Sequence, residues 1–150
     1  MTKSRILMVL FVLTTTVAFT QKPDYSGTWL LNLEKSKLTS GNSAKITKTI
    51  FFIEQQGDKF LLTRYRYMGE KKRRLKFKMT ADGERHNVKL LFNGKLEWIE
   101  EHLRASIWNK GFSNIVNYSF GANEDEFIAD ETFTSAKTNY HNHWVFDRVK

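Results

Sequence analysis

The chain has 150 residues, no cysteine and a single proline, Pro23. Without cysteine it forms no disulfide, and no cysteine is available to carry a lipid at a processed N-terminus. Proline removes a donor from the hydrogen-bond ladder of a sheet and is kept out of central strands. A chain whose one proline lies near its beginning is therefore typical of a continuous run of strands, and we see no composition change that would divide it into two domains.

The sequence also lacks the short motifs of common catalytic sites, such as Gly-x-Ser-x-Gly or a glycine-rich phosphate loop followed by a helix. The strongest acid or base candidate is Glu131, which lies between Ala129 and Phe133 on a predicted inward face. A salt bridge between Glu131 and an interior arginine or lysine is the favoured interpretation, because no second group with a defined role accompanies it. We therefore expect no enzymatic activity.

Residues 1–20 have the three parts of an export signal. A start with two basic residues precedes the apolar run 6–13, and Ala18-Phe19-Thr20 forms the expected cleavage site. The apolar run is shorter than the ~20 residues that a membrane-spanning helix needs. The sequence predicts a mature domain of residues 21–150 with no transmembrane span, soluble after cleavage and periplasmic or secreted.

Aromatic and β-branched runs separated by turn residues predict about nine strands and no amphipathic helix. Asn93-Gly94 has the sequence of a two-residue hairpin turn, and the long segment 96–108 is expected to bend. Closing a sheet of this size removes its two exposed edges. The predicted fold is all-β, a single antiparallel up-and-down barrel of about eight to nine strands. The expected strands are 27–33, 46–55, 59–67, 73–79, 85–92, 96–108, 112–120, 127–133 and 140–149.

A barrel of this size has room for packed side chains or for one small molecule. An outer-membrane barrel is disfavoured, because Arg74, Lys76 and Lys78 share one face of a strand and would meet lipid. The expected closure of the barrel joins its first and last strands. Gly27 lets the backbone turn in, Trp29 plugs one end, and Arg148 lies over the indole ring.

These closing residues carry a resemblance to a known family. Gly27-Thr28-Trp29 with Asn32, the segment Glu34-Lys35-Ser36-Lys37, and the terminal Phe146-Asp147-Arg148 resemble the lipocalin-like small exported barrels of bacteria. These are related in shape to lipocalins and fatty-acid-binding proteins. The resemblance implies a calycin-type barrel with a cavity for a small apolar or amphipathic molecule, such as a lipid or fatty acid, and no catalytic machinery.

The sequence leaves open which face of the strand 59–67 points inward. If Phe60 and Leu62 face the interior, one of the two arginines that follow at the same parity, Arg64 and Arg66, is placed to hold a carboxylate, and a fatty-acid-like anion becomes the leading ligand. The opposite orientation, with both arginines in water, is favoured because an unpaired buried charge is costly. The interior candidates for ligand contact are Phe60, Leu62, Arg64, Tyr118, Phe133, Tyr140 and Trp144.

Charge is uneven along the predicted mature chain, with a net of +10 in residues 21–95 and −4 in residues 96–150. The densest part, Arg64–Lys78, has eight basic residues and one acid. A second hypothesis follows, in which the barrel is fully packed and acts through this basic surface on an anionic envelope lipid or an acidic polymer. A solvated outer face is the favoured interpretation. No nucleic-acid partner is expected of an exported protein.

Metal binding has only an incomplete ligand set. His141 and His143 lie two residues apart on one strand face, but a stable zinc site needs a third or fourth ligand. We therefore predict no metal and no cofactor, with these histidines on the outer surface.

Overall fold

The computed structural model describes residues 22–39, 43–89 and 91–150. The predicted export signal, residues 1–20, lies outside these ranges. The described residues form ten strands and one 3-10 helix, η1 (Ser43–Lys45), and none of their helices has the length and apolar character to cross a membrane. The strands are β1 (Gly27–Leu31), β2 (Lys48–Gln56), β3 (Lys59–Met68), β4 (Lys71–Thr80), β5 (His86–Lys89), β6 (Phe92–Ile99), β7 (His102–Trp108), β8 (Phe112–Phe120), β9 (Glu126–Ser135) and β10 (Asn139–Arg148).

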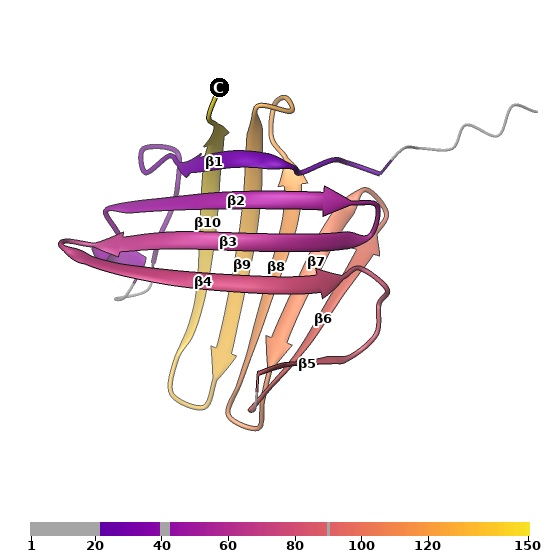
Figure 1. Ribbon diagram of the computed structural model, residues 1–150. Coiled ribbons are helices and arrows are strands. Elements are labelled where there is room, and N and C mark those ends of the chain that lie inside the picture. The colour runs from indigo at the N-terminus through magenta and orange to yellow at the C-terminus, as the bar shows by residue number, and fades with distance from the viewer. Residues whose placement is uncertain (1–21, 40–42, 90) are drawn as a thin grey trace, which may run out of the picture.

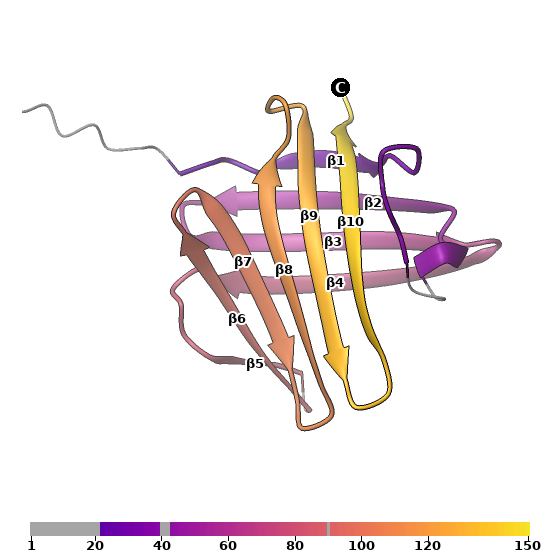
Figure 2. The same ribbon diagram turned by 180° about the vertical axis from the view of Figure 1, so that it is seen from behind.

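All ten strands belong to one antiparallel sheet in the order β4-β3-β2-β1-β10-β9-β8-β7-β6-β5. Each strand pairs with its sequence neighbours, except that β1 also pairs with β10 and that β4 and β5 are the two ends of the sheet. The sheet folds over so that β2 to β4 cross in front of β6 to β10 (Figure 1), as the view from behind also shows (Figure 2). The predicted all-β, antiparallel up-and-down barrel is confirmed, and it is nearly closed.

The strand count differs from the prediction because the segment 96–108 does not simply bend. It turns back at Glu100 and Glu101, with Ile99 paired to His102 across the turn. Glu100 adopts a φ of 56°, a left-handed conformation that a tight two-residue connection uses. Neither residue is glycine or asparagine, which such turns usually contain, so the sequence pattern predicts one long strand.

The predicted hairpin turn at Asn93-Gly94 is wrong. Both residues lie inside β6, where Gly94 pairs with His86 on one side and Ile107 on the other. An added Cβ at Gly94 would collide with Val88 and would lie 3.3 Å from Met79 Cε. Glycine is therefore needed here because neighbouring side chains lie too close to the backbone of β6 for a larger residue, which is a common reason for glycine inside a strand.

The first and last strands meet at the seam between β1 and β10. Trp29 pairs with Arg148 in the register, and the guanidinium carbon of Arg148 lies 4.1 Å from the centre of the indole ring. Gly27 has a φ of 138°, and an added Cβ there would lie 2.7 Å from Arg148 Nη1. Glycine is therefore needed both for its backbone conformation and for the approach of the arginine.

The buried aromatic residues pack on the inner side of this seam. Trp29 is fully buried and meets the ring of Phe127 edge-on at 4.9 Å, and Phe127 stacks on Phe146 at 4.6 Å. Phe51 from β2 and Tyr25 before β1 complete this cluster. These packed rings lie beside the paired strands β1 and β10. A cavity remains between the two crossing layers of strands.

Candidate functional site

A cavity of about 310 Å³ lies in the barrel interior between the two layers of strands. This volume is at the lower end of the range of small-molecule sites, roughly 300–1,000 Å³. The predicted alternation places the apolar side chains of β4 inside, where Leu75, Phe77 and Met79 line the cavity. The interior of the barrel is therefore not fully packed, in contrast to the premise of the second hypothesis.

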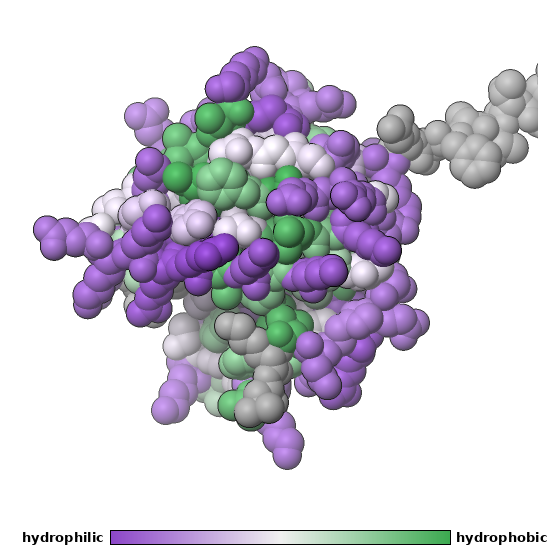
Figure 3. Space-filling view, in the orientation of Figure 1, coloured by the Kyte–Doolittle hydropathy of each residue, from purple (hydrophilic) through white to green (hydrophobic). Residues whose placement is uncertain are grey.

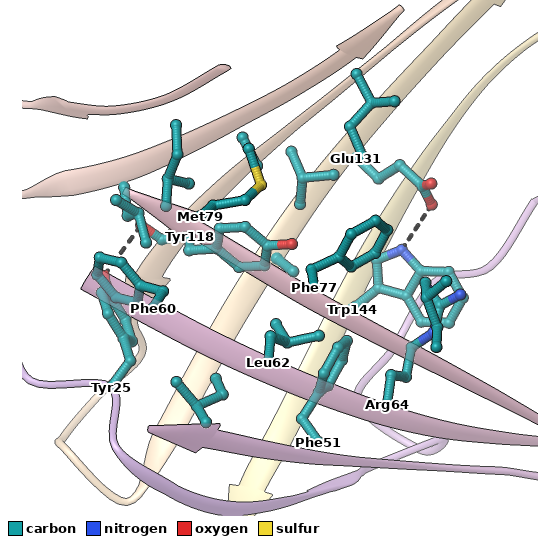
Figure 4. Close-up of a pocket in the computed structure, with 18 of the residues that line it drawn as sticks. Tyr25, Phe51, Phe60, Leu62, Arg64, Phe77, Met79, Tyr118, Glu131 and Trp144 are labelled. Carbon is teal, nitrogen blue, oxygen red and sulfur yellow. Dashed lines mark hydrogen bonds between the residues drawn. The ribbon is translucent and has the colours of Figure 1, made fainter. Parts of the chain in front are cut away.

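The two ends of the cavity differ in chemistry. Figure 4 shows Tyr25, Phe60 and Met79 at one end, and Arg64, Trp144 and Glu131 at the other. The remaining lining is almost entirely apolar or aromatic, with Asn114 and Arg66 as the other polar members. The cavity is thus amphipathic, with an apolar end and a polar end.

Arg64 and Arg66 line the cavity together with Phe60 and Leu62, so the orientation of β3 favoured from the sequence is wrong. The outward face of β3 also carries an aromatic residue, Tyr65, which packs against cations of β4. Lys72 Nζ lies 4.4 Å and Arg74 Cζ 5.8 Å from the centre of the Tyr65 ring. Tyr65 also meets the exposed ring of Phe52 edge-on at 5.9 Å.

The interior arginines have few partners. Arg66 lies over the Trp144 ring, with its guanidinium carbon 5.0 Å from the ring centre. The Nε atoms of Arg64 and Arg66 are buried without a hydrogen-bond acceptor among the described residues. Since an unpaired buried donor costs stability, these side chains are the part of the site that a bound acceptor would stabilise.

Burial lowers the pKa of Arg64 below its usual value, against the opposing effects of Tyr118 and Glu131. Burial, together with the neighbouring charge of Arg64, lowers the pKa of Arg66 to about 10, while Glu131 acts in the opposite direction. Both guanidinium groups therefore keep their charge at neutral pH. The polar end of the cavity contains two cations and one carboxylate.

Glu131 is held by neutral donors and not by the interior arginines. Oε1 accepts a hydrogen bond from Asn114 Nδ2 at 3.0 Å, and Oε2 accepts bonds from Asn142 Nδ2 and Trp144 Nε1, each at 2.9 Å. The favoured salt bridge is therefore wrong, because within the described ranges no cation lies within ion-pairing distance of this carboxylate. Asn142 is fully buried, and its Oδ1 accepts from the backbone N–H of Thr39 at 2.8 Å.

Five of the candidate contact residues line the cavity: Phe60, Leu62, Arg64, Tyr118 and Trp144. Burial raises the pKa of Tyr118 to about 12, so its phenol stays neutral at physiological pH. Phe133 and Tyr140 do not line the cavity; they stack on each other at 4.8 Å beside it. Their stack continues to Phe112, which does line the cavity and lies 5.5 Å from Phe133.

Two polar residues of the site, Asn114 and Asn142, were not among the candidates, and Arg66 was considered only in the disfavoured orientation of β3. The signal for Asn114 was present, because it shares a strand face with Phe112 and Val116. The signal for Asn142 was its position two residues before Trp144 on the inward face of the last strand. A polar residue on an otherwise apolar inward face is informative because burial requires it to have a partner.

The histidines of β10 differ from each other in their contacts. His143 Nδ1 lies 2.7 Å from Asp130 Oδ1, and His141 lies beside Thr132 at 3.2 Å. His141 is exposed and His143 half-buried. In the part of the chain that the structure describes, no group of three or more histidine, aspartate or glutamate side chains is arranged to hold a metal ion.

No protein-family model matches the chain, and no curated protein sequence matches it. Solved structures do match its fold. A zebrafish ileal bile-acid-binding protein complexed with cholic acid has a TM-score of 0.60 at 15% identity, covering 83% of this chain and 98% of its own. A Schistosoma mansoni fatty-acid-binding protein in complex with arachidonic acid has a TM-score of 0.60 at 12% identity, covering 84% and 96%.

Human cRBP IV is similar at a TM-score of 0.59 and 18% identity, covering 85% of this chain and 99% of its own. At these identities the likeness shows the fold, a calycin-type barrel, along nearly the whole length of each neighbour.

Proposed function

We propose that this protein is a non-enzymatic carrier of an amphipathic anion, such as a fatty acid, which it holds inside the barrel. One observation carries the proposal: two charged arginines line one end of an apolar cavity, and their buried Nε atoms have no hydrogen-bond acceptor among the described residues. An apolar chain would lie against Leu62, Phe77 and Met79, and its anionic head would receive the guanidinium donors of Arg64 and Arg66. A guanidinium is well suited to this role, because it presents paired donors to a carboxylate.

The comparisons support the ligand class. Two of the neighbouring barrels are described as complexes with acids, cholic acid and arachidonic acid. The bonding of Glu131 supports a binding role over an enzymatic one, because both of its oxygens already accept hydrogen bonds from fixed side chains. A general acid or base would instead have to exchange a proton with a bound substrate.

Export is part of the proposal. The charged start, the short apolar run and Ala18-Phe19-Thr20 support removal of residues 1–20. The mature domain would then be residues 21–150, acting in a periplasmic or secreted location. Mass spectrometry of the protein expressed in a bacterial host tests this: an N-terminus at Gln21 is the expected result, and an intact Met1 in an extracytoplasmic fraction would contradict it.

Titration calorimetry with dodecanoic acid tests the binding proposal. The chain should bind dodecanoate and should bind dodecanol, which has the same tail and no charge, at least about tenfold more weakly, since a charge-assisted hydrogen bond contributes roughly 1.5–3 kcal/mol. Arg64→Met and Arg66→Met should each remove most of this preference. Arg74→Met is the matched control, because Arg74 lies on the outer face of the same sheet. Equal binding of both probes, or no binding of either, would contradict the proposal.

A second candidate function has its own observation. On the outer face of the sheet, Lys72, Arg74, Lys76 and Lys78 alternate along β4 beside exposed apolar side chains of β1 and β2, Leu30 and Phe52. Figure 3 shows this face, where hydrophilic side chains form a row with apolar surface beside it. The predicted basic patch Arg64–Lys78 is thereby corrected, because Arg64 and Arg66 face the cavity. We propose that the outward residues contact an anionic lipid surface.

Sedimentation with vesicles of phosphatidylglycerol and phosphatidylcholine tests this contact. Binding should require the anionic lipid and weaken with salt. The double variant Arg74→Glu/Lys76→Glu should lose it, and Lys110→Glu/Lys137→Glu, with the same change in charge in the turns after β7 and β9, should keep it. Equal loss in both variants would contradict a specific face.

A further inference from the structure

The amide of Asn114 has a defined orientation at the polar end of the cavity. Its nitrogen donates to Glu131 Oε1 at 3.0 Å, and only the nitrogen can do so, because an ionised carboxylate accepts hydrogen bonds and does not donate them. The amide oxygen, Oδ1, therefore points elsewhere. It is buried and has no donor among the described residues. Asn114 lines the cavity, so its polar end contains one buried acceptor without a donor and two buried arginine Nε donors without an acceptor among the described residues.

The charges at this end do not cancel. Arg64 and Arg66 contribute two positive charges, and Glu131 contributes one negative charge whose effect on both guanidinium groups opposes that of burial. Glu131 is fixed in place by three hydrogen bonds. One positive charge is left for a ligand to balance, and a ligand with two negative charges would be placed near the carboxylate of Glu131.

From these two features we infer that the head group of the ligand carries one negative charge and one hydroxyl. The arginines donate hydrogen bonds to the anion, Asn114 Oδ1 accepts a hydrogen bond from the hydroxyl, and Glu131 limits the negative charge to one. The ligand class is a hydroxylated amphipathic monocarboxylate. This inference rests on the proposed function, and it makes Asn114 and Glu131 the residues that determine specificity.

The reason is that polar groups buried in a mostly apolar cavity favour a ligand that supplies their missing partners. A plain fatty acid would use the arginines and leave Asn114 Oδ1 without a donor, as it is in the free protein, whereas a hydroxyl would supply that donor. A dianionic head would gain attraction to the arginines and meet repulsion from Glu131, since like charges at short range disfavour the charged form. A single charge with a neighbouring hydroxyl supplies an acceptor to the arginines and a donor to Asn114 Oδ1.

Three probes with the same twelve-carbon chain separate these cases: dodecanoic acid, 3-hydroxydodecanoic acid and dodecyl phosphate at pH 8, where the phosphate is largely a dianion. We expect the hydroxy acid to bind about tenfold more tightly than dodecanoic acid. Dodecyl phosphate should bind more weakly than either acid. Titration calorimetry of the unsubstituted protein gives this ranking without requiring any variant to fold.

Two variants then assign the ranking to its residues. Asn114→Ala should remove the preference for the hydroxy acid and leave the affinity for dodecanoic acid within about twofold. Its control is Asn117→Ala, because Asn117 lies on the other face of β8 and accepts a bond from Arg104 at 2.8 Å. Glu131→Gln should raise the affinity for dodecyl phosphate about tenfold, and Asp130→Asn on the same strand should not.

The outcomes separate the two proposals. Binding of all three probes with equal affinity would overturn the inference on the head group and leave the proposed carrier function in place. Failure of all three to bind would overturn the carrier function itself. A hydroxyl preference that survives Asn114→Ala would show that another acceptor is responsible, and would overturn the role of Asn114.

Discussion

The barrel contains two arginine–tryptophan stacks, and they differ in the hydrogen-bond acceptors around the arginine. At the seam, Arg148 lies over Trp29 at 4.1 Å, and its Nη1 donates to the carbonyl oxygen of Ser26 at 2.7 Å. Its Nε and Nη2 both donate to the carbonyl oxygen of Glu124, at 3.1 and 2.9 Å. The donors of this arginine are directed at fixed acceptors of the chain, so its role is to hold the first and last strands, β1 and β10, together.

In the cavity, Arg66 lies over Trp144 at 5.0 Å, and its Nε is buried without an acceptor among the described residues. Trp144 in turn donates to Glu131. The comparison teaches that the same pair of side chains is structural where backbone carbonyls accept the donors of the arginine, and it supports the proposed binding role where they do not. The following substitutions test this distinction.

The largest effect is expected from Trp29→Ala. Trp29 has 0% exposure, and replacing a buried large aromatic side chain by alanine costs about 3–5 kcal/mol of unfolding free energy. Urea unfolding followed by circular dichroism measures this cost. Trp108→Ala, at a half-buried tryptophan of β7, is the control and should cost less than half as much. Similar losses in both would contradict the special role of the seam.

Arg148→Met should lower the unfolding free energy by about 2–3 kcal/mol, because it removes the stack and the hydrogen bonds to Ser26 and Glu124. Arg66→Met should have the opposite sign, a gain of up to about 1 kcal/mol, because it removes a buried charge whose Nε has no hydrogen-bond acceptor among the described residues. The same urea experiment compares the two. A loss at Arg66 as large as that at Arg148 would show that both stacks are structural.

Gly27→Ala should cost about 1–2 kcal/mol, because its φ of 138° disfavours any side chain and the new Cβ would displace Arg148. Gly57→Ala sharpens the measurement. Gly57 also has a positive φ, 59°, but no atom lies within 4 Å of an added Cβ. The difference between the two variants therefore reports the crowding at the seam, and a difference near zero would contradict it.

The smallest effect concerns pH. Because the pKa of Arg66 is lowered to about 10, dodecanoate affinity should stay level from pH 7 to 9 and fall about twofold by pH 10, where half of this group is uncharged. Calorimetry across this range measures the change, and Arg66→Met should abolish it. The effect of Arg66 on stability changes with pH in the opposite direction. The folded state releases the guanidinium proton at a lower pH than the unfolded state does, so the free energy of unfolding rises with pH above pH 10.

Much of the fold was predictable from residue order. Strict alternation in the stretch from Leu75 to Met79 assigns one face to the interior, and the structure places those side chains there. The pairing of the first strand with the last was expected from closing the sheet, and it is present, although β4 and β5 remain as two edges. The export signal stays a prediction, since residues 1–20 lie outside the described ranges.

The polar end of the site was harder to predict, because β3 carries apolar and aromatic residues on both faces. Phe60 and Leu62 alternate with Leu61 and Tyr65, so a period of two does not by itself choose the inward side. The argument from the cost of buried charge chose wrongly, since it considered Arg64 and Arg66 without Trp144 and Glu131. Those residues come from β9 and β10, about seventy positions away in the chain.

Residue order alone thus decided most of the strands, most of their faces and the pairing of the first strand with the last, because these depend on local backbone preference and on a hydrophobic pattern of period two. Only the tertiary structure decided that the interior is hollow and that the Nε atoms of its arginines have no acceptor among the described residues. Both properties depend on how far apart the two layers pack and on which distant side chains meet, and neither quantity is carried by any single stretch of the chain.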